Sequence, residues 1–217
     1  MLASGIFLEG MAGHADALRN DLRGFILAGG ASRRMGRDKA QIPWGGGTLL
    51  THAIEQMEPV ASEVSIVGTL TAENLAVPVL TDKIPGLGPL AGIHSALSRS
   101  TSDWNLILAV DLPLVTPELL AWIADFRVVA SQTAIVPRVS SRLQPLCAIY
   151  HRKILPQIDQ ALVRRESSIR RLLERLGTRI IEEDQLIASG FAPEMLFNVN
   201  TPEDLERARA IAKSMNG

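Results

Sequence analysis

The chain alternates short apolar runs with segments of helical pattern. The apolar runs have strand length and little polar alternation, as is typical of strands buried on both faces of a sheet. They cover residues 24–29, 63–68, 77–80, 104–110, 133–137 and 145–150. Apolar spacing and end signals predict helices over residues 48–57, 88–100, 116–126, 168–177 and 201–214. Strands that alternate with helices predict an α/β fold with a mostly parallel sheet and helices on both faces.

Two of the predicted helices begin with the pair Thr-Pro. Thr116 is expected to cap one of them, with Pro117 at its first helical position. The helix over 201–214 repeats the pair, and Asp204 can complete a turn of the capping-box type. Gly177 is expected to end the amphipathic helix that precedes it. These signals set the expected helix boundaries.

No low-complexity linker or internal repeat divides the 217 residues, so the sequence predicts a single domain. Residues 1–23 contain no motif and little periodic apolar pattern, and we expect a flexible N-terminal extension ahead of a domain over 24–217. The extension lacks the basic start and long apolar segment of a signal peptide. We expect a chain that starts at Met11 to keep full activity.

Composition narrows the class of protein. Hydrophobic residues make up 47% of the chain, which fits a globular protein and argues against disorder. The 22 basic and 23 acidic residues give a net charge of −1, so the overall charge indicates neither a nucleic acid nor an anionic membrane as partner. No apolar run approaches the roughly 20 residues of a membrane helix. The one cysteine, Cys147, fits a reducing cytoplasm, and its apolar neighbours favour a buried hydrophobe over a nucleophile.

Several polar or glycine residues follow predicted strands. In a parallel sheet, ligands bind beyond the carboxyl ends of the strands. Gly29 and Gly30 stand where the first strand should stop, and Asp111 follows the apolar run "LILAV". Asn198 and Asn200 follow what we expect to be another short strand. We therefore expect these residues to converge at one edge of the sheet.

The stretch "FILAGGASRRMGRDKAQI", residues 25–42, combines glycines with basic side chains. Glycines let backbone N–H groups approach a ligand closely. The basic residues are Arg33, Arg34, Arg37 and Lys39. The stretch has neither the G-x-G-x-x-G fingerprint nor a Gly-Lys-Ser/Thr phosphate loop. Phosphate binding is the favoured interpretation, and a glycine turn followed by a solvated basic loop is the alternative.

Asp111 narrows the chemistry of the predicted site. A carboxylate directly after a buried apolar strand has no packing role, and Thr116 already caps the next helix. Mg²⁺ prefers carboxylates together with phosphate oxygens. A basic glycine loop and a strand-end aspartate therefore suggest metal-assisted chemistry on the phosphates of a nucleotide.

The stretch "LAGGASRRMGRDKA" resembles the L-A-G-G-x-S-x-R-M-G-x-D-K signature of the molybdenum cofactor guanylyltransferases. Sugar-nucleotide transferases of the same fold tend to have Ala for the second Gly and Pro before the Lys. The resemblance continues in the family's order through residues 88–97, 109–120, 142–150 and 197–208. It implies a Rossmann-like fold of the nucleotide-diphospho-sugar transferase type. It also implies transfer of GMP from GTP to molybdenum-molybdopterin, with Mg²⁺ as cofactor and release of pyrophosphate.

The resemblance assigns roles to single residues. Leu27, Ala28, Gly29 and Gly30 would hold the nucleotide, as would Asp82 in "PVLTDK". Lys39 would contact the phosphates with help from Arg34, and Asp111 would bind the metal. Asn198 and Asn200 would lie on the pterin side, with Asn200 also near the metal.

Two positions depart from the family pattern. Many relatives carry an Asn after the second strand, where this chain has Gly68 or Thr69. A backbone contact from Gly68 could substitute. The glycine that usually precedes the arginine of "RLQPL" is Ser141 here.

Alternatives remain open from sequence. One is a transferase of the same fold that uses CTP on molybdopterin or acts on a sugar phosphate. The other is a nucleotide-binding partner protein without turnover, against which Lys39 and Asp111 argue. The resemblance is also compatible with partners that handle molybdopterin or mature molybdoenzymes. The four histidines form no constellation, and we interpret them as structural or surface residues.

Overall fold

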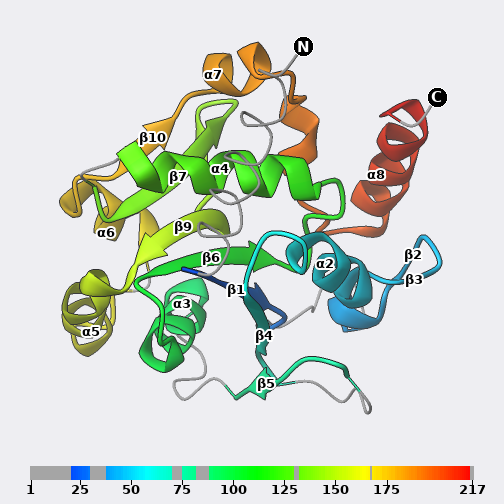
Figure 1. Cartoon of the computed structure of the whole chain (residues 1–217). Coiled ribbons are helices and arrows are strands. Elements are labelled where there is room, and N and C mark those ends of the chain that lie inside the picture. Colours follow the sequence, from blue (N-terminus) through cyan, green and yellow to red (C-terminus); the bar gives the residue numbers. More distant parts are fainter. Residues whose placement is uncertain are drawn as a thin grey trace, which may run out of the picture.

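The computed structural model describes residues 21–29, 38–69, 75–81, 88–129, 132–166 and 168–215. In this part of the chain a central sheet is flanked by helices (Figure 1). None of the described helices is long and apolar enough to cross a membrane. Several predicted features lie outside the described residues: residues 1–20 of the predicted extension, Gly30, Arg33, Arg34, Arg37 and Asp82. Leu22 and Arg23, the last two residues of the predicted extension, belong to the first strand of the sheet.

The main sheet has the strand order β10-β7-β9-β6-β1-β4-β5, and β8 pairs with β7 beside this path. Its strands are β1 (Leu22–Leu27), β4 (Glu63–Val67), β5 (Val79–Leu80), β6 (Trp104–Ala109), β7 (Ala134–Val139), β8 (Arg142–Leu143), β9 (Cys147–His151) and β10 (Arg179–Ile181). Pairing is parallel through β6, β1, β4 and β5, and β9 runs antiparallel to both of its neighbours. The mostly parallel sheet is confirmed.

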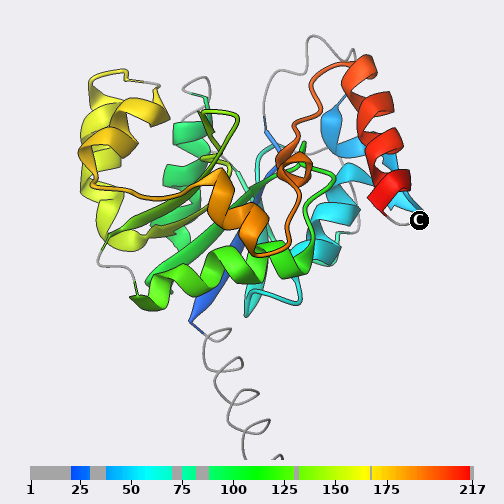
Figure 2. The same ribbon diagram turned by 90° about the horizontal axis from the view of Figure 1, so that it is seen from above.

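Helices cover both faces of the sheet, as Figure 2 shows from above. They are α2 (Leu49–Met57), α3 (Pro89–Arg99), α4 (Pro117–Val129), α5 (Leu155–Val163), α6 (Ile169–Arg175), α7 (Glu183–Ala188) and α8 (Pro202–Met215). Short 3-10 turns are η1 (Lys39–Gln41), η2 (Arg152–Ile154) and η3 (Pro193–Leu196), and a small hairpin joins β2 (Pro43–Trp44) to β3 (Gly47–Thr48). The five predicted helices are confirmed, and α5 and α7 were not predicted.

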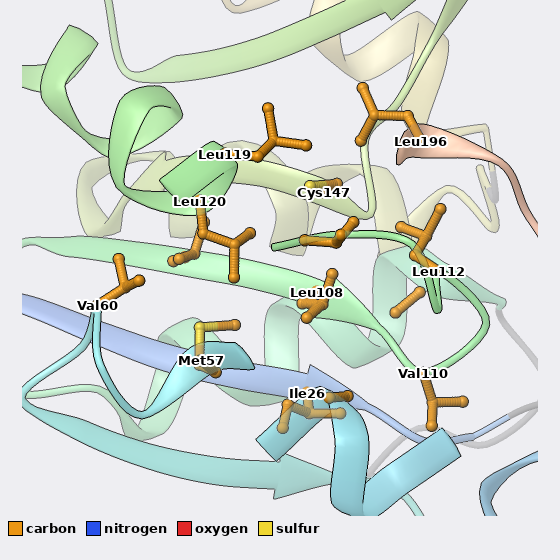
Figure 3. Close-up of a cluster of buried hydrophobic side chains, with 14 of the residues drawn as sticks. Ile26, Met57, Val60, Leu108, Val110, Leu112, Leu119, Leu120, Cys147 and Leu196 are labelled. Carbon is orange, nitrogen blue, oxygen red and sulfur yellow. The ribbon is translucent and has the colours of Figure 1, made fainter. Parts of the chain in front are cut away.

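Alternate residues of the central strands enter two separate cores. Ile26 of β1 and Leu108 of β6 face a core that includes side chains of α2 and α4 (Figure 3). Phe25 of β1 and Ile107 of β6 face a second core, which α3, α5 and α6 complete. Residues 25–27 of β1 and 106–109 of β6 are therefore all apolar, because both faces of the sheet are buried there.

The predicted helix ends are confirmed, with one correction nearby. Thr116 accepts from the N–H of Leu119 at 3.4 Å, and Gly177 has the left-handed φ of +59° that a helix terminator needs. The short strand expected before Asn198 was wrong. Residues 193–196 form η3 instead, because Pro193 opens a 3-10 turn and cannot donate to a strand ladder.

Candidate active site

Three parallel strands end level with one another at the predicted edge. Leu27 pairs with Val67 of β4 and with Ala109 of β6. Backbone bonds continue the ladder one residue further, since the N–H of Ala28 donates to Val67 at 2.9 Å and the N–H of Val110 donates to Leu27 at 3.1 Å. The next residues in each chain segment therefore emerge together at this edge.

The first strand presents backbone at this edge. Leu27 and Ala28 are only 8% and 6% exposed, and the side chain of Leu27 belongs to the core shared with α3. Gly29 is the first exposed residue after the strand. These three predicted nucleotide contacts could therefore be made by main-chain atoms, because the side chains of Leu27 and Ala28 are buried and Gly29 has none.

Gly68 lies against this loop and has no space for a side chain. A Cβ atom at position 68 would lie 2.8 Å from the carbonyl oxygen of Ala28 and 3.1 Å from the nitrogen of Gly29. The φ of Gly68 is +155°, and its N–H donates to Leu80 at 3.0 Å. Position 68 of this chain therefore has no room for an asparagine side chain. Thr69, which is exposed, is the first side chain beyond it.

Lys39 lies on the short turn η1, which is held by capping and by burial. The carboxylate of Asp38 accepts from the N–H of Ala40 at 3.0 Å. Ala40 and Ile42 are 0% and 1% exposed, so they anchor the turn in the core. The motif residue Asp38 therefore acts here as a cap, and the turn directs Lys39 toward the strand ends.

The ammonium group of Lys39 joins two segments that are far apart in the sequence. Its Nζ donates to Oδ2 of Asp111 at 2.8 Å and to Oδ1 of Asn200 at 2.8 Å. The side chains of Lys39 and Asp111 are 18% and 19% exposed, which limits screening of this pair by water. The structure thus brings together three of the residues that the sequence singled out.

Asp111 has one carboxylate oxygen left for a ligand. Its Oδ1 is buried and has no hydrogen-bond partner among the described residues. Burying an unpaired carboxylate oxygen is costly, so this atom is suited to a cation. The described residues contain no cluster of three or more acidic, histidine or cysteine side chains that could hold a metal. A Mg²⁺ ion would therefore use Asp111 together with phosphate and water oxygens, which fits its usual coordination.

A backbone hydrogen bond connects the "NVN" segment to Asp111. The N–H of Val199 donates to the carbonyl of Asp111 at 2.9 Å, and the Val199 side chain is fully buried. Val199 therefore points into the core. Asn200 is exposed and meets Lys39, whereas Asn198 is half-buried. Sequence reasoning did not anticipate the Val199 bond, which fixes the distance between Asn200 and Asp111.

A positive helix end also faces this edge. Helix α3 connects the parallel strands β5 and β6, so it begins beyond their carboxyl ends. Gly88 occupies its N-cap position with a φ of +68° and offers no side-chain cap. Pro89 at the first helical position has no N–H group, and the N–H of Ala91 donates to the carbonyl of Gly88 at 3.2 Å. The helix dipole is therefore the feature that favours an anion there.

His52 supports the loop after Asp111 and was not singled out by sequence. Its Nε2 lies 3.0 Å from the carbonyl of Pro113, and its Nδ1 lies 3.5 Å from the amide of Gln56. Burial is the main cause that lowers the pKa of His52, which favours the neutral ring. A neutral ring protonated on Nε2 satisfies the Pro113 carbonyl. His52 is therefore structural, as was expected of the histidines.

Cys147 lies in the core between the sheet and α4 (Figure 3). Burial raises the pKa of its thiol to about 12, so the thiolate is inaccessible at neutral pH. The interpretation as a buried small hydrophobe is confirmed.

Comparison with known proteins identifies the family. Residues 24–180 match the model of the MobA-like NTP transferase domain. A probable molybdenum cofactor guanylyltransferase of Carboxydothermus hydrogenoformans is 36% identical over 183 residues, which cover 84% of this chain and 92% of that protein. One from Pelotomaculum thermopropionicum is 33% identical and covers 88% and 93%. The crystal structure of molybdopterin-guanine dinucleotide biosynthesis protein A from Archaeoglobus fulgidus has a TM-score of 0.78 at 26% identity, covering 88% and 99%. The chain thus belongs to the MobA-like NTP transferase family and is a nucleotidyltransferase.

Proposed function

We propose that this protein transfers GMP from GTP to the terminal phosphate of molybdenum-molybdopterin, forming the guanine dinucleotide and releasing pyrophosphate. The contact of Lys39 with Asp111 and Asn200 carries this proposal. It unites the first, third and last family motifs in one place, with a cation, a carboxylate and an amide side by side. That combination suits a reaction in which two phosphate groups must meet.

The reaction needs no nucleophile from the protein. An oxygen of the acceptor phosphate attacks the α-phosphorus of GTP, and the bond from this phosphorus to the bridging oxygen breaks as pyrophosphate leaves. Both reactants are anions, so the task of the protein is to position them and to offset their charge. Mg²⁺ held by Asp111 would supply positive charge at the phosphate oxygens.

Lys39 has to change partners when GTP binds. In the structure its ammonium group pairs with Asp111 and Asn200. Triphosphate oxygens would compete for this cation, and its release from Asp111 would free Oδ2 beside Oδ1, which has no hydrogen-bond partner among the described residues. Asn200 keeps Lys39 within reach of both positions. Arg34 is the proposed second cation at the leaving group.

The nucleotide and the acceptor would occupy different sides of this centre. Backbone groups of Leu27, Ala28, Gly29 and Gly30 would hold GTP, with Gly68 contributing through its main chain and Asp82 contributing its carboxylate. Asn198 would hold the pterin, because an amide offers a donor and an acceptor to a ring edge that carries both.

Incubation of the protein with GTP, Mg²⁺ and molybdenum-loaded molybdopterin tests the proposal. We expect the guanine dinucleotide and pyrophosphate to form in equal amounts. CTP in place of GTP should give little product, and calorimetry should show tighter binding of GTP than of CTP or ATP. A preference for CTP would indicate a cytidylyltransferase. Nucleotide binding without pyrophosphate release would indicate a partner protein that has no turnover.

A further inference from the structure

Helix α8 begins at Pro202, two residues after Asn200. Ala208 is its fully buried side chain among the described residues, and Leu205, Ile211 and Ala212 pack against the core while partly exposed. Hydrogen bonds fix its first turn. Oδ2 of Asp204 accepts from the N–H of Thr201 at 3.0 Å, and the N–H of Asp204 donates to the Thr201 hydroxyl at 3.2 Å. This reciprocal pair is a capping box.

Asp204 also makes a bond that a capping box does not need. The same Oδ2 accepts from the N–H of Asn200 at 2.9 Å. One residue earlier, the N–H of Val199 is bonded to Asp111. The main chain of Asn200 is thus fixed on both sides, and its exposed amide is left with little freedom to move away from Lys39.

A second contact from α8 reaches the segment that carries Lys39. Nη2 of Arg209 donates to the carbonyl of Pro43 at 3.1 Å, just beyond the turn η1. In Figure 1 the helix, drawn in red, lies beside the β2–β3 hairpin. Helix α8 therefore contacts both segments whose side chains meet at the ammonium group, through Asp204 on one side and Arg209 on the other.

We propose that Asp204 is a positioning residue for nucleotidyl transfer, which acts through Asn200 to hold Lys39 between Asp111 and the nucleotide phosphates. The proposal rests on the proposed function of the site. Without the carboxylate, the main chain of Asn200 loses its bond to α8. The Asn200 oxygen then no longer presents a fixed acceptor to the ammonium group, so Lys39 spends less time in its productive position.

A double-mutant cycle tests this route. Asp204→Ala should lower kcat/KM for GTP about tenfold, the scale of one hydrogen bond to a charged group. In the Asn200→Ala background the same change should cost about twofold or less, because the residue through which it acts is gone. Equal losses in both backgrounds would overturn the proposal. Asp204→Asn, which keeps the shape but weakens the acceptor, gives the same cycle if the alanine variant folds poorly.

Two neighbours serve as matched controls. Thr201→Ala removes the cap hydroxyl and should destabilise the start of α8 by a similar amount, yet it leaves the bond from Asn200 to Asp204. Glu203→Ala removes the adjacent first-turn charge. Both should keep kcat/KM within about twofold of the wild type. A tenfold loss of kcat/KM in Thr201→Ala would mean that Asp204 acts only by capping the helix.

NMR of the protein without substrates provides a readout apart from activity. The side-chain amide signals of Asn200 should shift and broaden in Asp204→Ala and stay unchanged in Glu203→Ala. Unchanged signals in Asp204→Ala would contradict the proposal. If the wild-type protein forms no dinucleotide, the proposed function fails, whereas the amide signals still decide whether Asp204 holds Asn200.

Discussion

Main-chain atoms form one side of the candidate active site, and side chains form the other. On the side proposed for the nucleotide, Gly29 and Gly68 bring two main chains together, and an added Cβ at position 68 would lie 2.8 Å from a carbonyl oxygen. On the other side, Lys39, Asp111 and Asn200 meet through the ends of their side chains at 2.8 Å. A substitution where main chains pack together has to change the shape of the site. A substitution in the side-chain cluster can instead remove a charge and leave the shape unchanged. We therefore expect substitutions on the first side to act through fit and those on the second to act through rate.

Asp111→Asn should give the largest effect. The change keeps the size of the side chain but removes the charge that pairs with Lys39 and would hold Mg²⁺. Electrostatic groups of this kind contribute a factor of about one hundred or more in rate. GTP affinity should fall less, because the glycine loop and Lys39 remain. Dinucleotide formation at saturating GTP across a Mg²⁺ titration measures this, and a near-normal rate with normal Mg²⁺ dependence would place the metal elsewhere.

Lys39→Ala should show a mixed effect on binding and rate. Its charge acts on phosphates in the ground state as well as in the transition state, so GTP affinity should fall about tenfold together with the rate. The change also frees Oδ2 of Asp111. Mn²⁺ binding to the nucleotide-free protein, followed by electron paramagnetic resonance, should therefore become tighter. Weaker Mn²⁺ binding would show that Lys39 does not compete with the metal for Asp111.

Gly68→Ala tests the backbone side. The new methyl group cannot fit beside Ala28 and Gly29, so the main chains have to separate. Such overpacking typically costs about 1–3 kcal/mol, and we expect lower thermal stability together with weaker GTP binding. The bound-state rate should change little. Gly46→Ala is the matched control, because a Cβ there meets nothing within 4 Å. Equal behaviour of the two variants would contradict the steric account.

The sequence predicted the parallel side of the sheet well. The run "LILAV" before Asp111 is apolar at every position because β6 is buried on both faces, and Asp111 follows at the carboxyl end of this strand. Strands β8 and β10 were missed, since two or three residues are too few to show a periodic pattern. The six residues of α7 have the same difficulty. The antiparallel direction of β9 could not be predicted, because an apolar run has the same sequence pattern in either direction.

The sequence predicted which residues belong to the candidate site better than it predicted the hydrogen bonds between them. The strand-end rule placed Asp111 correctly, whereas Asn200 lies at the same edge although the short strand expected before it is a 3-10 turn. Lys39 and Asn200 are 161 residues apart, and only the folded structure shows that they share a hydrogen bond. The capping signal at Asp204 was readable from the sequence. Its additional bond to Asn200 was not, because it depends on the path of the chain before the helix begins.

The β7–β8 turn should give the smallest effect. Its backbone has a left-handed conformation that favours glycine, but serine occupies both positions. Ser140 and Ser141 have φ values of +48° and +62°, and a left-handed conformation costs a residue with a Cβ roughly 1 kcal/mol or more. Ser141→Gly should therefore raise the free energy of unfolding, by about 0.5–1 kcal/mol after the greater chain entropy of glycine is subtracted. The bond from the N–H of Ser140 to Glu183 should persist, so kcat/KM should stay unchanged.

Urea denaturation measures the effect of Ser141→Gly. Ser98→Gly, on the exposed face of α3, is the control, because the same chemical change in a helix should lower stability by roughly 0.5 kcal/mol. Opposite signs for the two variants would show that local φ decides the outcome. A loss of stability in Ser141→Gly would mean that the serine side chain contributes more to this turn than its backbone strain costs. Backbone conformation would then not limit position 141 in the way that it limits position 68. The contrast between backbone-limited and side-chain positions would apply only to the loops of Gly29 and Gly68.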